Sequence, residues 1–146
     1  MMIKMIKSML TRKYLLYISW IVAIMAMIGS LYFSEILHLP PCSLCWYQRI
    51  LMYPLVLIIP VGILLNDRKI YMYVLPMSVL GMIVAFYHYL LYIRVIPEVI
   101  APCSAGVSCI TKLIEFFGFI NIPLLSFVAF TFISIAMLIC RKNENI

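Results

Sequence analysis

The chain has 146 residues, of which 66% are hydrophobic and 11% charged, and its mean hydropathy is +1.15. These values exclude a water-soluble globular domain and predict an integral membrane protein in contact with a lipid bilayer. The formal net charge of +6 does not indicate nucleic-acid binding, because the basic residues cluster at the ends of apolar segments rather than on one solvent-facing surface.

Four apolar segments have about the 20 residues that a helix needs to cross a hydrocarbon core of about 30 Å. The predicted spans are 14–33, 46–65, 70–93 and 118–139. The first follows a basic stretch as in a signal peptide, but it lacks a small-residue cleavage site, so we expect a retained helix. No repeat or linker interrupts the chain, and we therefore expect one membrane domain, 1–146.

The basic residues predict the orientation of the four spans, since cytoplasmic loops carry an excess of Lys and Arg. If both termini and the 66–69 turn are cytoplasmic, eight of the 11 basic residues lie inside. These are Lys4, Lys7, Arg12, Lys13, Arg68, Lys69, Arg141 and Lys142. Only Arg49, Arg94 and Lys112 then lie outside. The sequence therefore predicts an all-α bundle of four transmembrane helices with both termini in the cytoplasm.

Two cysteine pairs fall in the two connections that this topology places outside the cytoplasm. Cys42 and Cys45 end the first connection, and Cys103 and Cys109 lie in the second, 97–117. Apolar residues recur at helical spacing over 110–117, which predicts a short interfacial helix there. Because disulfides form and persist outside the cytoplasm, both pairs are candidates for disulfide bonding.

The four cysteines could have several chemical roles. A zinc site is possible in principle, but extracytoplasmic thiols tend to oxidise, and we expect no metal. Covalent haem attachment is excluded because Trp46 follows Cys45 where a His is needed. Structural disulfides remain an alternative, although bridges that close so few residues constrain the unfolded chain little. Local bridges at a membrane surface are better suited to thiol exchange.

The residues around the first pair favour redox chemistry. A helix N-terminus stabilises negative charge and so favours a thiolate, the reactive form of cysteine. Arg49 lies four residues after Cys45, on the same helix face. Its guanidinium either extends to the membrane surface or stabilises the Cys45 thiolate or a reduced electron acceptor.

The stretch LPPCSLCWYQRILMYPL at 39–55, together with PCSAGVSC at 102–109, resembles the DsbB disulfide-bond formation family, and in particular its short BdbC-like branch. The resemblance covers nearly the whole chain. It implies a multi-pass protein of the bacterial cell membrane that acts as a thiol:quinone oxidoreductase. Such a protein reoxidises an extracytoplasmic thioredoxin-like thiol oxidase and passes electrons to a membrane quinone, either menaquinone or ubiquinone.

The resemblance also implies roles for individual residues. Cys103 is expected to form the mixed disulfide with the partner, and Cys109 to resolve it. Exchange with Cys42 and Cys45 follows, which leaves Cys45 beside the quinone and Arg49 near a quinone oxygen. Position 48 is Gln, as in the short branch, where other relatives often have an acidic residue.

Three further side chains bear on the site. Gln48 and His88 are candidate quinone-binding residues, and an intramembrane His can also relay a proton. Packing inside the bundle is the alternative for His88. Cys140, at the inner end of the fourth span, is given no catalytic role.

Two other functions stay open at this stage. One alternative is a membrane scaffold or chaperone whose outer loops are held by structural disulfides. The other is a reductant that delivers electrons outward to incorrect disulfides. Only the family resemblance sets the direction of electron flow.

Overall fold

The computed structural model describes residues 2–38, 40–97 and 121–144. They form α1 (Met2–Leu31), a π-helical turn η1 (Tyr32–Ile36), α2 (Ser43–Leu64), α3 (Tyr71–Tyr92) and α4 (Ile122–Glu144). All four α-helices contain an apolar stretch long enough to cross a membrane. Within the described residues there is no strand. The predicted all-α bundle of four membrane-spanning helices is thus confirmed.

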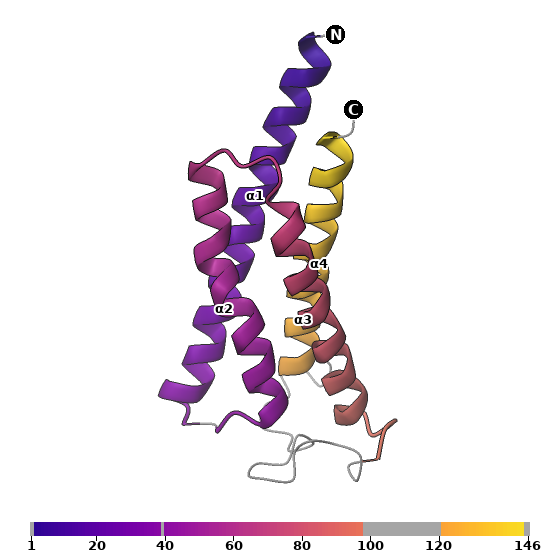
Figure 1. Cartoon of the computed structure of the whole chain (residues 1–146). Coiled ribbons are helices and arrows are strands. Elements are labelled where there is room, and N and C mark those ends of the chain that lie inside the picture. Colours follow the sequence, from indigo (N-terminus) through magenta and orange to yellow (C-terminus); the bar gives the residue numbers. More distant parts are fainter. Residues whose placement is uncertain (1, 39, 98–120, 145–146) are drawn as a thin grey trace.

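The helices run side by side, and both chain termini lie at the same end of the bundle (Figure 1). The α2–α3 connection lies at that end too, so six of the described basic residues lie in segments near it. They are Arg12, Lys13, Arg68, Lys69, Arg141 and Lys142. Arg49 and Arg94 lie toward the opposite end. The separation agrees with the predicted charge asymmetry, and the cytoplasmic location of the termini stays a prediction.

The helix ends differ from the predicted spans for local reasons. α1 begins at Met2, well before position 14, because Lys, Arg and Met are good helix formers and extend the helix beyond its apolar part. α4 is described from Ile122 rather than 118, and the Asn121 Oδ1 accepts a hydrogen bond from the Leu124 N–H at 2.9 Å. This is an N-cap interaction. The interfacial helix predicted over 110–117 lies outside the described residues.

Pro60 lies inside α2 and is compensated by a side chain from α1. Proline has no N–H, so the Val56 carbonyl four residues earlier lacks its helical donor. The Trp20 indole Nε1–H donates to this carbonyl at 2.9 Å. In lipid a freed backbone group has no water to bind, and a neighbouring helix must supply the partner. Trp20 therefore holds α1 against α2 at the proline.

Helices α3 and α4 pack closely through small residues. A Cβ atom at Gly81 of α3 would overlap the ring of Phe130, which is fully buried on α4. Ser134 of α4 donates a hydrogen bond to the Ser78 hydroxyl of α3 at 3.0 Å. Glycine and serine are typical of membrane helix interfaces, because they let two backbones approach. The close packing fixes α3, and with it the position of His88.

At the end that carries the termini, Asp67 joins α1 to the α2–α3 connection. The Arg12 Nη2 donates to the Asp67 carbonyl at 2.7 Å, and the Tyr73 hydroxyl donates to the Asp67 carboxylate at 2.7 Å. The hydrogen bond from Tyr73 lowers the pKa of Asp67, with a further contribution from the Lys69 backbone N–H. Asp67 therefore stays ionised and has a structural role.

Candidate active site

Cys42 and Cys45 lie together at the start of α2. Cys42 is the N-cap residue, with extended backbone angles, and its sulfur accepts a hydrogen bond from the Cys45 N–H at 3.4 Å. The two Sγ atoms are 3.0 Å apart. A disulfide requires about 2.05 Å, so only a small movement separates the dithiol from the bonded form. Because Cys42 caps the helix and Cys45 lies three residues later, in the first turn, the two sulfurs lie close together.

The Cys42 thiol is buried, with 7% of the residue exposed, and it packs with Leu44 and Leu91 at the end of the bundle. Cys42 precedes the first residue of the membrane span. The hydrogen bond with the Cys45 side chain lowers the pKa of the Cys42 thiol, burial opposes this effect, and His88 lowers the pKa further. Cys42 is therefore the thiol of this pair whose thiolate is stabilised by its neighbours.

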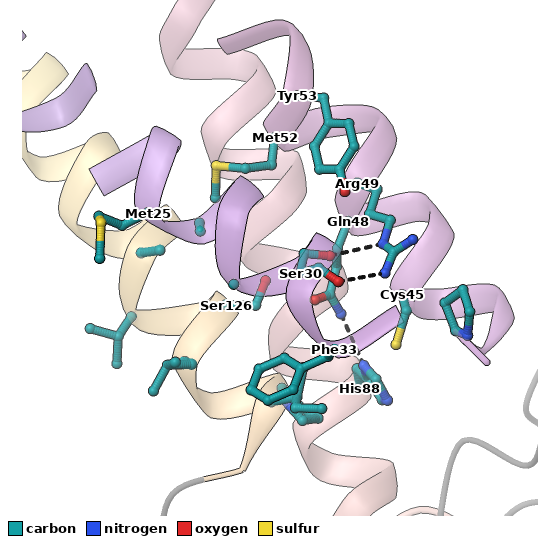
Figure 2. A pocket seen from close by; sticks show the side chains of 18 of the residues that line it. Met25, Ser30, Phe33, Cys45, Gln48, Arg49, Met52, Tyr53, His88 and Ser126 are labelled. Carbon is teal, nitrogen blue, oxygen red and sulfur yellow. Dashed lines mark hydrogen bonds between the residues drawn. The ribbon is translucent and has the colours of Figure 1, made fainter. Parts of the chain in front are cut away.

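His88, on α3, connects Cys42 to Gln48 on α2. The His88 Nε2 lies 3.7 Å from the Cys42 sulfur. The His88 Nδ1 lies 3.0 Å from the Gln48 Nε2 (Figure 2). An amide NH₂ group can only donate, so Nδ1 accepts and the proton of the neutral ring is on Nε2, facing Cys42. Both His88 and Gln48 are buried. With its Nε2–H directed at Cys42, the His88 ring can thus stabilise a thiolate at the Cys42 sulfur.

Arg49 is held against the end of α1. Its Nε donates to the Ser30 hydroxyl at 2.8 Å, and its Nη2 donates to the Ser30 carbonyl at 2.9 Å (Figure 2). The guanidinium carbon also lies 5.5 Å from the centre of the Trp46 ring, a cation–π contact. The contact with Ser30 lies just before the π-helical turn, a feature often found at functional sites. These contacts fix the charge beside the cysteines.

A cavity of about 670 Å³ extends from the cysteines along α2 and lies mainly between α1, α2 and α4. Its polar lining is concentrated near the cysteines, and the rest is apolar. Several apolar lining residues are exposed on the side of the bundle that would face lipid, namely Ile21, Met25, Leu125, Val128 and Phe132. Both the volume and the lining are typical of a site for a small, largely apolar molecule.

The structure brings five predicted site residues around this one cavity: Cys42, Cys45, Gln48, Arg49 and His88. Trp46 and Tyr47 do not line it and are 55% and 52% exposed, as expected at a membrane interface. Cys140 lies in the main core, toward the other end. Cys103 and Cys109 lie outside the described residues, so their predicted roles stay predictions.

Two lining residues, Ser30 and Tyr53, were not among the predicted site residues. Tyr53 follows Arg49 by four positions, which would have placed both on one helix face. With 10 tyrosines in the chain, this spacing alone did not distinguish it. Ser30 belongs to a different helix, and no sequence pattern connects it to Arg49.

The site also contains three atoms that are able to bind a metal ion. The Cys42 sulfur, the Cys45 sulfur and a His88 ring nitrogen lie within 4.8 Å of one another. Thiolate and imidazole are zinc ligands, but a structural zinc site normally has four ligands, and the described residues supply three. The absence of a resident metal stays a prediction.

The family model described as "Disulfide bond formation protein DsbB" matches residues 12–140. Disulfide bond formation protein C of Bacillus subtilis (strain 168) is 48% identical over 139 residues, 94% of this chain and 99% of that protein. No solved structure gives a significant match.

Two further relatives extend the similarity. Probable disulfide formation protein C 2 of Bacillus cereus is 46% identical over 134 residues, 92% of this chain and 96% of that protein. The probable disulfide formation protein of Metapseudomonas resinovorans is 38% identical over 132 residues, 90% of this chain and 92% of that protein. Both similarities span nearly the full length of the chain.

Proposed function

The chain belongs to the DsbB family of disulfide bond formation proteins, and from this premise we propose that it is a thiol:quinone oxidoreductase. It reoxidises an extracytoplasmic thioredoxin-like thiol oxidase and so supports disulfide formation in exported proteins. The observation that carries the proposal is the position of the Cys42–Cys45 pair and Arg49 on one apolar cavity that is lined by lipid-side residues. This arrangement gives a dithiol access to a lipid-soluble electron acceptor.

The proposed exchange conserves electrons at each step. A thiolate of the partner attacks the Cys103–Cys109 disulfide at the Cys103 sulfur, and Cys109 leaves as a thiolate. The second thiol of the partner then resolves the mixed disulfide, because resolution by Cys109 would release the partner still reduced. The partner leaves as a disulfide, and Cys103 and Cys109 become a dithiol. That dithiol then reduces a Cys42–Cys45 disulfide and is itself reoxidised. Each step is a thiolate attack on a sulfur, so a thiol with a lowered pKa, such as Cys42, is a good leaving group.

The described residues fit a quinone. The cavity is large enough for its ring and mostly apolar, and the Arg49 guanidinium lies at its polar end. When bound, menaquinone or ubiquinone accepts two electrons and two protons from the Cys42–Cys45 dithiol, which returns to the disulfide. Arg49 is held in place by Ser30 and supplies positive charge on the same helix face as Cys45.

Gln48 and His88 are placed at the quinone site, and they also act on the Cys42 sulfur. The two side chains bind each other, and His88 also contacts the Cys42 sulfur. This pairing supports a role in which the His88 Nε2–H donates a hydrogen bond to the Cys42 thiolate while Gln48 fixes the ring. Both residues line the cavity, as Cys42 does, so the stabilised thiolate lies where the acceptor binds.

We place the protein in the bacterial cell membrane, with the end that carries Cys42 on the outer face. The basic residues at the opposite end of the bundle support this orientation, since positive charge favours the cytoplasmic side.

The test is quinone reduction by the purified protein, supplied with a reduced thioredoxin-like oxidase and a soluble quinone. Cys45→Ser should reduce the rate to background, and Arg49→Ala should lower it by about tenfold or more, since hydrogen bonds to charged groups contribute about 1.5–3 kcal/mol. Cys140→Ser is the matched control, because Cys140 lies in the main core and does not line the cavity. Failure of the wild-type protein to reduce any quinone would refute the proposal.

A further inference from the structure

Tyr53 carries a buried hydroxyl group that has no hydrogen-bond partner among the described residues. Two other buried side-chain atoms share this property, Arg12 Nε and Ser19 Oγ, but neither residue lines the cavity. A buried donor without a partner is destabilising by about 1–3 kcal/mol. A cost of this kind at a cavity wall points to a ligand that supplies the missing acceptor.

The helix geometry directs Tyr53 toward the redox residues. Cys45, Arg49 and Tyr53 are successive positions four residues apart, so they share one face of α2. Helical side chains tilt toward the N-terminus of their helix, which brings the Tyr53 hydroxyl back toward Arg49. In Figure 2 the hydroxyl end of the ring is directed toward the side of the pocket with Arg49 and Gln48.

We propose that the Tyr53 hydroxyl donates a hydrogen bond to a carbonyl oxygen of the quinone bound in this cavity. The inference rests on the proposed function and adds a binding residue to it. The apolar surroundings strengthen such a bond, because water does not compete for the donor. The bond is also stronger when the acceptor oxygen gains negative charge, so Tyr53 favours the reduced form of the ligand.

The ring of Tyr53 and its hydroxyl have separable roles. The ring packs against the core formed by all four helices. Phenylalanine preserves that packing, and its introduction removes only the oxygen that lacks a partner. Tyr53→Phe is therefore expected to fold normally, and it isolates the contribution of the hydrogen bond.

The experiment measures equilibrium binding of a soluble naphthoquinone to the detergent-solubilised protein, through quenching of its tryptophan fluorescence. Tyr53→Phe should raise the Kd by about five- to tenfold, the equivalent of one hydrogen bond of about 1 kcal/mol. Tyr47→Phe is the matched control, since Tyr47 is on the same helix, is 52% exposed and does not line the cavity. The Kd of this control should match that of the wild type.

Binding of the corresponding naphthalene, which lacks both carbonyl oxygens, distinguishes hydrogen bonding from packing. The wild type should prefer the naphthoquinone, and Tyr53→Phe should lose about five- to tenfold of that preference. Equal weakening of both ligands would show a packing effect and overturn the inference. Unchanged naphthoquinone binding by Tyr53→Phe would also overturn it and leave the proposed function intact, whereas a wild type that binds no quinone would refute both.

Discussion

Helix α4 is closely packed on its face toward α3 and lines a cavity on its face toward α1. Toward α3, the Phe130 ring occupies the space left by Gly81, and the hydroxyl of Ser134 is paired with that of Ser78. Toward α1, the residues of α4 line a cavity, and across it the hydroxyl of Tyr53 on α2 has no partner among the described residues. The filled face pairs its polar groups within the protein. Across the open face, the Tyr53 hydroxyl of α2 is left for a ligand. This difference separates residues that stabilise the bundle from residues that bind the ligand.

Two glycine-to-alanine substitutions test whether the two faces differ in packing. Gly81→Ala places a Cβ against the Phe130 ring and should lower the free energy of unfolding by about 1–3 kcal/mol. Gly29→Ala, on the cavity wall, places its Cβ where no described atom lies within 4 Å. Stability should then be unchanged or slightly higher, because alanine is the better helix former. Thermal unfolding in one detergent compares them, and equal destabilisation would contradict the contrast.

The His88 contact with Cys42 gives the polar end of the cavity a measurable pH dependence. The side chains of Cys45 and, to a smaller extent, His88 hold the pKa of the Cys42 thiol below its ordinary value. The Cys42 thiolate therefore persists to lower pH. Alkylation of reduced Cys42 by iodoacetamide should be constant above that pKa and fall as the pH drops through it.

Replacing His88 sharpens this prediction. In His88→Phe the pKa of Cys42 should rise, and alkylation below the midpoint should slow by about tenfold, the effect of one pKa unit. The measurement is the pH profile of Cys42 alkylation, followed by peptide mass spectrometry. Gln48→Leu should move the midpoint in the same direction but less, because it only releases the His88 ring. A midpoint that His88→Phe leaves unchanged would contradict the contact.

Hydropathy and motif spacing were sufficient to predict the four spans and the Cys42–Cys45 pair, because both signals are local in sequence. His88 is different, since it lies 46 residues from Cys42 and 40 from Gln48. Its position depends on how α3 packs against α2, which the sequence does not encode in any short pattern. The sequence pointed to His88 only because a histidine inside a membrane span is uncommon.

The helix ends and the Arg49 partner illustrate two other limits. The start of α4 depends on a single side chain, Asn121, which caps the helix after an apolar stretch that hydropathy alone extends to 118. Whether Arg49 reaches the membrane surface or stays in the site depends on Ser30 of a different helix. In both cases one hydrogen bond decides the outcome, and a window average over many residues cannot detect it.

The smallest expected effect concerns a polar group that is paired within the protein. Trp20→Phe removes the indole N–H that binds the Val56 carbonyl, and the free energy of unfolding should fall by about 1 kcal/mol. In a Pro60→Ala background the new N–H at position 60 can bind that carbonyl, so Trp20→Phe should have little effect there.

A double-mutant cycle of Trp20 and Pro60 measures this coupling, and purely additive losses would show that the indole hydrogen bond does not compensate for the proline. Tyr53→Phe completes the comparison. Its hydroxyl has no partner among the described residues, so its removal should leave the stability of the ligand-free protein unchanged or slightly higher. Trp20→Phe should thus affect unfolding and Tyr53→Phe only quinone binding, because Trp20 donates to its own chain and Tyr53 donates to the ligand.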